Sequence, residues 1–123
     1  MRKTVEAVLM ILLAATVVIA KTQFVGVGFV KTTGDPVGDE ARAILRAELS
    51  AVQSAVYAED PETCDREAAA VRLETEYHED PFRYITDSSI TAKQTKHGRL
   101  KITVVVTVND RAVRRLCKHV TGG

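Results

Sequence analysis

The first twenty residues have the pattern of an export signal rather than of a domain, so only the remaining residues are left to form the fold. Two basic residues precede an apolar run at residues 7–20, which is interrupted only by Thr16 and ends at Ala20. At 1.5 Å per helical residue, its fourteen residues reach roughly 21 Å, short of the roughly 30 Å hydrocarbon core of a bilayer. We therefore expect cleavage after Ala20 and export of residues 21–123 as a single domain.

Glu6 leaves two alternatives open. An acidic residue at the head of an apolar helix is also a feature of type IV pilin subunits, in which the segment is retained as the filament core. Those subunits usually carry a small residue, most often glycine, just before the cleavage point, and none precedes Glu6. The alternatives to cleavage are thus a retained membrane anchor and a pilin-like filament subunit. In every case we expect membrane contact only through residues 1–20.

The two cysteines are expected to form a disulfide. Residues 21–123 are enough for one small domain with a marginal core, which a covalent link would help to stabilise. The number of cysteines in residues 21–123, Cys64 and Cys117, is even. In a chain expected to be exported, pairing is the default expectation, and two buried free thiols are the alternative. Closing a loop of about fifty residues would stabilise the fold by on the order of 4 kcal/mol in the chain-entropy model.

Charge is unevenly distributed. Residues 1–20 hold two basic residues and one acidic residue, so removing them takes 17 basic residues to 15 and 16 acidic residues to 15. Residues 59–80 hold nine acidic and two basic residues, whereas residues 93–119 hold eight basic and one acidic. The neutral total argues against a nucleic-acid-binding protein, which normally has a basic excess. A disulfide between the cysteines would place the two oppositely charged blocks side by side.

A strand is expected near the start of the domain. Residues 24–30 combine β-branched, aromatic and glycine residues, and the Thr, Gly, Asp and Pro residues at 32–36 predict a turn after them. Gly26 and Gly28 leave one face of this strand without side chains, which we interpret as close packing of a helix. A dinucleotide-binding fingerprint is not expected, because Lys31 stands where its third glycine would be.

Two helices are expected next. Apolar residues recur at three- and four-residue steps over residues 39–58, and Asp60-Pro61 ends this pattern. A second, less regular helix is expected at residues 62–78, with Ala68, Val71 and Leu73 as its apolar residues.

A β-hairpin and a short helix complete the chain. The hairpin arms are expected at residues 84–93 and 99–109, joined by a turn at residues 96–98, and the second arm alternates apolar and polar residues. Residues 110–120 place four apolar residues on one side of a possible helix, with basic residues around it. The apolar residues are Val113, Leu116, Cys117 and Val120.

The predicted fold is α+β: a small three-stranded, mostly antiparallel sheet packed on one face by helices, in the order strand-helix-helix-strand-strand-short helix. The two long periodic apolar faces each need a partner, so we expect them to pack together. The residues concerned are Ile44, Leu45, Leu49 and Val52 in the helix and Leu100, Ile102, Val104 and Val106 in the strand.

This order resembles a known family. VGVGFVKTTGD followed by EARAILRAELSAVQSAVYA is similar to the start of the N-terminal domain of bacterial flagellar assembly protein T and of related small envelope lipoproteins. FRYITDSSITAKQTKHGRLKITVVVTV is similar to their later hairpin, so the resemblance covers about residues 22–109. It implies a small non-enzymatic domain of the cell envelope that contacts other proteins. The lipoproteins carry a cysteine directly after the signal, whereas Lys21 stands there in this chain, so no lipid anchor is expected.

The sequence contains no recognisable catalytic arrangement. No serine lies in a Gly-x-Ser-x-Gly turn, and neither cysteine has a histidine placed to activate it. A zinc site built from both cysteines and His119, with or without His78, would lack the paired short spacings of such sites, so neither a metal nor another cofactor is expected. We expect a periplasmic or extracellular interaction or assembly module that binds protein partners or its own copies through a basic tail. The tail consists of Arg111, Arg114, Arg115 and Lys118.

Overall fold

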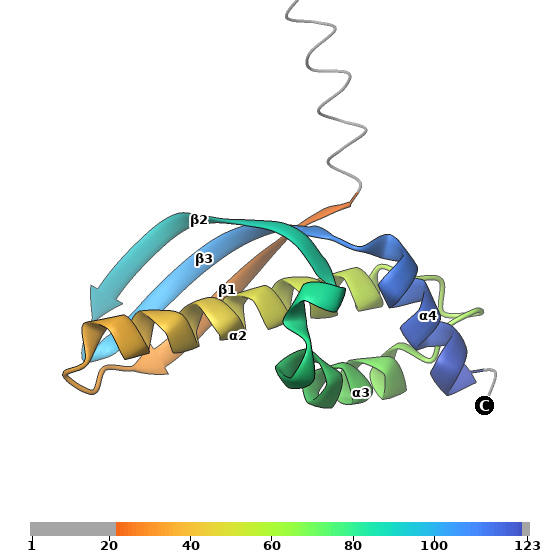
Figure 1. Ribbon diagram of the computed structural model, residues 1–123, viewed down its shortest axis with the longest axis horizontal. Coiled ribbons are helices and arrows are strands. Elements are labelled where there is room, and N and C mark those ends of the chain that lie inside the picture. The colour runs from red at the N-terminus through yellow and green to blue at the C-terminus, as the bar shows by residue number, and fades with distance from the viewer. Residues whose placement is uncertain (1–21, 122–123) are drawn as a thin grey trace, which may run out of the picture.

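Three antiparallel strands and three helices make up the part of the chain that the computed structural model describes, residues 22–121 (Figure 1). The elements are β1 (Gln23–Lys31), α2 (Pro36–Tyr57), α3 (Arg66–Glu79), the short 3-10 helix η1 (Pro81–Arg83), β2 (Ile85–Lys96), β3 (Arg99–Val108) and α4 (Asp110–Thr121). Strand β3 lies in the middle of the sheet, between β1 and β2. The expected α+β fold and element order are confirmed. The expected cleavage site and its alternatives fall on residues 1–20, outside the described residues.

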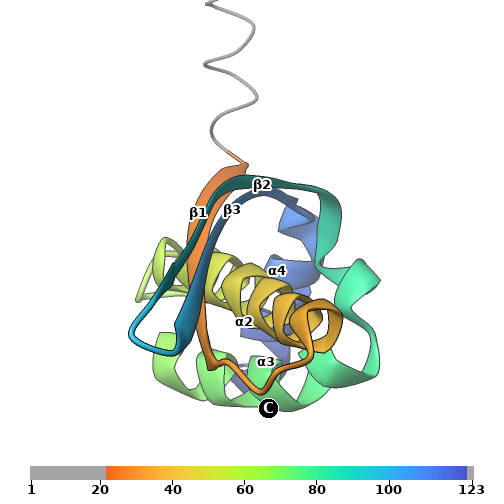
Figure 2. The ribbon, with the colours of Figure 1, turned by 90° about the vertical axis from the view of Figure 1, so that its left-hand side faces the viewer.

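The elements form layers. The curved sheet arches over α2, and α3 lies on the side of α2 that faces away from the sheet (Figures 1 and 2). Helix α2 packs mainly on β1 and β3, while α4 packs against α3 and α2 at one end of the molecule (Figure 1). None of the helices within residues 22–121 is long and apolar enough to cross a membrane.

Gly26 and Gly28 let the backbone of α2 approach β1 directly. A Cβ atom at Gly28 would lie 2.6 Å from the backbone nitrogen of Ala47 and closer still to the carbonyl oxygen of Ala43. At Gly26 it would meet the backbone of Ala47 and Ala51 in the same way. Contacts below 3.0 Å are essentially never made by real Cβ atoms, so only glycine fits at these two positions while α2 stays in place. The expected packing of a helix on the glycine face is confirmed.

The same close contact corrects the expected core. The face of α2 that touches the sheet is centred on small residues at four-residue intervals, Ala43, Ala47 and Ala51, which are fully buried. Larger side chains would hold the helix away from the glycines, so Ile44, Leu45 and Leu49 lie at the border of this face and are only partly buried. Val52, the fourth expected residue, is fully buried. The prediction for the sheet was correct, because the residues of β3 that face α2 are buried. They are Leu100, Ile102, Val104, Val106 and Val108.

Helix α2 begins earlier than expected because Asp35 caps it. The side chain of Asp35 accepts a hydrogen bond from the Gly38 backbone, and Pro36 occupies the first turn, where its missing N–H costs nothing. Asp39, expected near the helix start, is 3% exposed and accepts hydrogen bonds from the backbone and the hydroxyl of Thr33. These bonds and an ion pair with Arg42 fasten the turn between β1 and α2.

The β-hairpin closes with a tighter turn than expected. His97 and Gly98 have φ values of 53° and 72°, and two positive φ values are typical of the type I′ turn that suits the twist of paired strands. Strand β2 is irregular at two places, next to Thr86 and Thr91. Both hydroxyls donate to carbonyl groups of β3, at 3.3 Å each, so they help to hold the irregular edge strand on the sheet.

Helix α3 begins four residues later than expected, at Arg66, because the Asp65 side chain caps it by accepting from the Ala68 backbone. Its buried face also differs: Leu73 is buried, but Val71 is 68% exposed and Ala68 is only partly buried. Tyr77 takes a core position that the apolar pattern did not indicate. The remaining buried residues of this helix are Ala69 and Ala70.

Substitution of Gly28 by alanine tests the close contact. The new methyl group would meet helix backbone, which cannot rotate away, so we expect Gly28→Ala to lower the free energy of unfolding by at least about 3 kcal/mol. Val25→Ala, on the outer face of the same strand, should cost about 1 kcal/mol or less. Urea unfolding of both variants measures the difference. Equal stability of Gly28→Ala and the unsubstituted chain would show that α2 does not touch β1 as described.

Candidate protein-interaction surface

A disulfide fixes α4 to the turn before α3. Cys64 and Cys117 are bonded across 53 residues of sequence, and both are buried. The pairing expected from the sequence is present, and such a link fits an oxidising compartment. Because both sulfur atoms are used in this bond, neither cysteine can be a metal ligand in this state. Within the described residues, no group of three or more His, Cys, Asp and Glu side chains could hold a metal ion.

Helix α4 buries the face that carries Cys117 and exposes the basic tail on its other side. Ala112, Val113, Leu116 and Cys117 are buried against the rest of the domain. The helical repeat therefore places the basic residues on the exposed side, as the sequence indicated. They are Arg111, Arg114, Arg115 and Lys118. Val120 and His119 have side chains outside the described part of the structure.

The tail is only partly neutralised. Arg114 forms an exposed ion pair with Asp110 on the same helix, at 3.1 Å. Arg111, Arg115 and Lys118 form no ion pair with any side chain that the structure describes. Such exposed pairs stabilise proteins little, so the net positive charge of α4 remains available to a partner.

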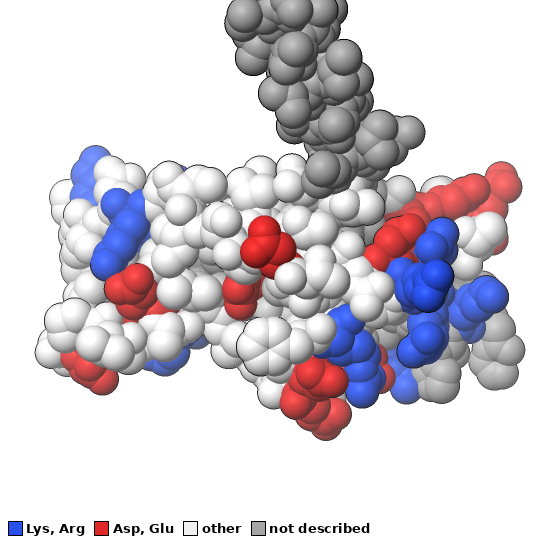
Figure 3. Space-filling model, turned by 45° about the horizontal axis from the view of Figure 1, so that its top comes forward, with Lys and Arg blue, Asp and Glu red and all other residues white. Residues whose placement is uncertain are grey.

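The acidic and basic blocks are neighbours, as expected. They attract each other by longer-range electrostatics rather than by direct ion pairs between described side chains. Figure 3 shows acidic and basic side chains side by side at the end that holds α4 and the α2–α3 turn. No ion pair among the described side chains joins residues 59–80 to residues 93–118. Burial and the nearby Asp110 raise the pKa of Glu59, while Arg114 opposes this shift.

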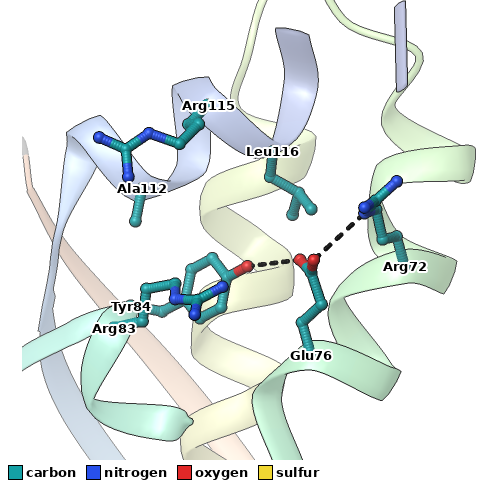
Figure 4. Close-up of a pocket in the computed structure, with 7 residues that line it drawn as sticks. All are labelled: Arg72, Glu76, Arg83, Tyr84, Ala112, Arg115 and Leu116. Carbon is teal, nitrogen blue, oxygen red and sulfur yellow. Dashed lines mark hydrogen bonds and ion pairs between the residues drawn. The ribbon is translucent and has the colours of Figure 1, made fainter. Parts of the chain in front are cut away.

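A hollow beside the tail gathers three arginines. Its volume is about 130 Å³, and it lies where α3, η1 and α4 meet (Figure 4). Arg72 comes from α3, Arg83 from η1 and Arg115 from α4. The other lining residues are Glu76, Tyr84, Ala112 and Leu116. Of the three arginines, only Arg115 was predicted from the sequence, because Arg72 lies in the acidic block and Arg83 lies next to a proline-containing turn.

Among the described residues, Glu76 is the one acidic residue that lines this hollow. Its carboxylate accepts hydrogen bonds from the Tyr84 hydroxyl at 2.8 Å and from Arg72 Nε at 3.2 Å (Figure 4). Burial alone would raise the pKa of Glu76, but these hydrogen bonds and the charges of Arg72 and Arg83 outweigh it and lower that pKa. Burial and the same hydrogen bond raise the pKa of Tyr84 to about 12, so it stays a neutral donor.

The hollow therefore has an excess of positive charge. Arg72 is bonded to Glu76, and Arg83 lies 3.7 Å from Asp80 in an exposed pair. Arg115 reaches the hollow from the opposite side to Glu76 (Figure 4). Three guanidinium groups and one carboxylate can together accept a further carboxylate or another oxyanion, because the planar guanidinium matches the geometry of such groups.

Comparisons with protein-family models, with curated proteins and with solved structures give no match to this chain. The resemblance to flagellar assembly protein T and the envelope lipoproteins therefore stays a prediction.

The hydrogen bonds of Glu76 predict a pH dependence of stability. Its pKa in the folded state lies below the usual 4.5. The stabilisation is therefore present above about pH 4.5 and is lost as pH falls through the folded-state pKa. We expect Glu76→Gln to be less stable than the unsubstituted chain at pH 7, and to lose less stability between pH 6 and 3. Glu74→Gln, an exposed position of the same helix, is the control. Identical slopes for Glu76→Gln and Glu74→Gln would contradict the assignment.

Proposed function

We propose that this chain is an exported cell-envelope or secreted interaction module without catalytic activity, and that α4 with the adjoining hollow binds acidic segments of protein partners. The observation that carries this proposal is the meeting of Arg72, Arg83 and Arg115 from three separate elements at one hollow with a single carboxylate. Arg72 and Arg83 come from consecutive elements, but Arg115 comes from the distant helix α4, so the arrangement is not a by-product of one charged helix.

The chemistry favours an acidic protein segment as the partner. An aspartate or glutamate side chain can form paired hydrogen bonds with a guanidinium group, and each charge-assisted bond is worth about 1.5 to 3 kcal/mol. A long polyanion such as nucleic acid fits less well. It would also meet Asp60 and Glu62, which lie in the turn that the disulfide joins to α4, and like charges repel there.

Export is supported by the pattern of residues 1–20 and by the disulfide. The link between Cys64 and Cys117 holds α4 in place, and it forms and persists in oxidising compartments. Loss of this bond would free α4 and separate Arg115 from Arg72 and Arg83. Binding by the proposed surface should therefore depend on the compartment in which the protein is folded.

Charge reversal at Arg115 tests the binding surface. The probe is a fluorescein-labelled ten-residue polyglutamate peptide, followed by fluorescence anisotropy at low salt. We expect Arg115→Glu to weaken its affinity about tenfold, the effect of losing one charge-assisted contact. Arg46→Glu makes the same change of charge at an exposed position of α2 and should leave the affinity nearly unchanged. Equal effects of the two variants would show that the peptide responds only to net charge.

Intact mass tests the export part of the proposal. Protein isolated from the native host should lack residues 1–20 and should weigh two hydrogen atoms less than its fully reduced form. A native N-terminus at Met1, or free thiols at Cys64 and Cys117 in protein handled without reductant, would contradict export with cleavage.

A further inference from the structure

The strand register places three basic residues directly beside one another at the end of the sheet. Lys31 of β1 is paired with Arg99 of β3, and Arg99 is paired with Lys96 of β2. All three are exposed on the face of the sheet that points away from α2. Like charges in directly opposed positions destabilise a sheet, so this row carries a cost that the fold itself does not explain.

The next row adds a fourth cation and an aromatic ring. Lys101 is paired with Phe29, whose ring centre lies 5.8 Å from Lys101 Nζ and 5.2 Å from Arg99 Cζ. These cation–π contacts hold both charged groups over the sheet. A hollow of about 300 Å³ lies among these side chains. We name Lys31, Lys96, Arg99 and Lys101 the cationic corner.

No described acidic side chain neutralises the cationic corner. None of its four residues forms an ion pair with any residue from 22 to 118, although Lys93 on the other face is paired with Glu40 at 2.9 Å. Lysines on edge strands commonly prevent unwanted strand pairing, which would account for Lys31 and Lys96. Arg99 lies on the central strand, so protection of an edge does not account for it.

The matching negative charge lies at the other end of the same molecule. The turn between α2 and α3 and the start of α3 expose Asp60, Glu62 and Glu67, and none of them forms an ion pair with a described residue. We name these three residues the acidic turn. Helix α2 separates the two ends, and its 22 residues span about 33 Å. This distance exceeds the Debye length of about 8 Å at physiological salt, so the two ends cannot neutralise each other within one copy.

We propose that the cationic corner of one copy binds the acidic turn of a second copy, head to tail. Figure 3 shows basic side chains at the end with the β2–β3 turn, and acidic side chains next to the basic ones of α4 at the end with the α2–α3 turn. The two surfaces are different, so the contact is heterologous, and each added copy leaves one free end of each kind. Such a contact extends into a chain of copies unless its geometry closes a ring.

A second copy fits the cationic corner better than a polyanion does. The domain of residues 21–123 is neutral, so assembly adds no net charge with each copy. A bound polyanion would instead give the neutral domain a net negative charge. This inference rests on the proposed role as an interaction module, but it uses surfaces at different residues from the basic tail.

Two single charge reversals and their mixture test the proposal. Arg99→Glu places a negative charge within the cationic corner and keeps the acidic turn, whereas Glu62→Lys places a positive charge within the acidic turn and keeps the corner. Sedimentation velocity of the natively processed protein over a range of concentrations should show salt-sensitive oligomers for the unsubstituted chain and monomers for each variant alone. The mixture should form a dimer that does not grow further, because only one productive contact remains. Both positions are exposed, so the melting temperature of each variant should stay close to that of the unsubstituted chain.

Three outcomes would overturn the proposal. The first is a monomer at every concentration and salt level, and the second is oligomers that both variants still form. The third is binding of the corner to inorganic polyphosphate, lost in Arg99→Glu, without any self-association, which would identify a polyanion as the occupant. Arg115→Glu separates this inference from the proposed function: it should reduce polyglutamate binding and leave self-association unchanged.

Discussion

The fold depends on one close contact, in which the backbone of α2 lies against Gly26 and Gly28 of β1. This approach requires glycine on the strand and alanine at every fourth position of the helix, at Ala43, Ala47 and Ala51. It fixes α2 under β1 and β3 and leaves most of β2 uncovered on both faces. Because α2 is then the long axis of the molecule, it also decides how far apart the two charged ends lie.

Much of this arrangement was predictable because local patterns and tertiary packing agree. The alternation of β3 identified its buried face, and the glycines of β1 indicated a helix on that face. The error lay in the choice of helix residues: large side chains such as Ile44 and Leu49 suggest a core by size, but a contact between backbones selects the smallest residues instead. Caps at Asp35 and Asp65 moved helix starts by several residues, since an aspartate fits both a turn and a first helical turn.

The candidate sites show where prediction from one sequence ends. The basic tail could be identified because four cations lie within one short helix. The arginine hollow could not, since Arg72 and Arg83 meet Arg115 only through the packing of α3, η1 and α4. The i, i+4 spacing of Arg72 and Glu76 was the one local signal available, and it is common on exposed helices. The cationic corner likewise depends on strand register, which places Lys31, Arg99 and Lys96 in one row.

The most direct test of the central contact is a nuclear Overhauser spectrum of the folded protein. If the α2 backbone lies on β1 as described, the Hα protons of Gly26 and Gly28 should give strong cross-peaks to the amide and Hα protons of Ala43, Ala47 and Ala51. Cross-peaks from these glycines to the methyl groups of Ile44 or Leu49 instead, with none to the alanine backbone, would contradict the account. In that case α2 would be turned and lifted from the sheet, and the packing described here would not hold.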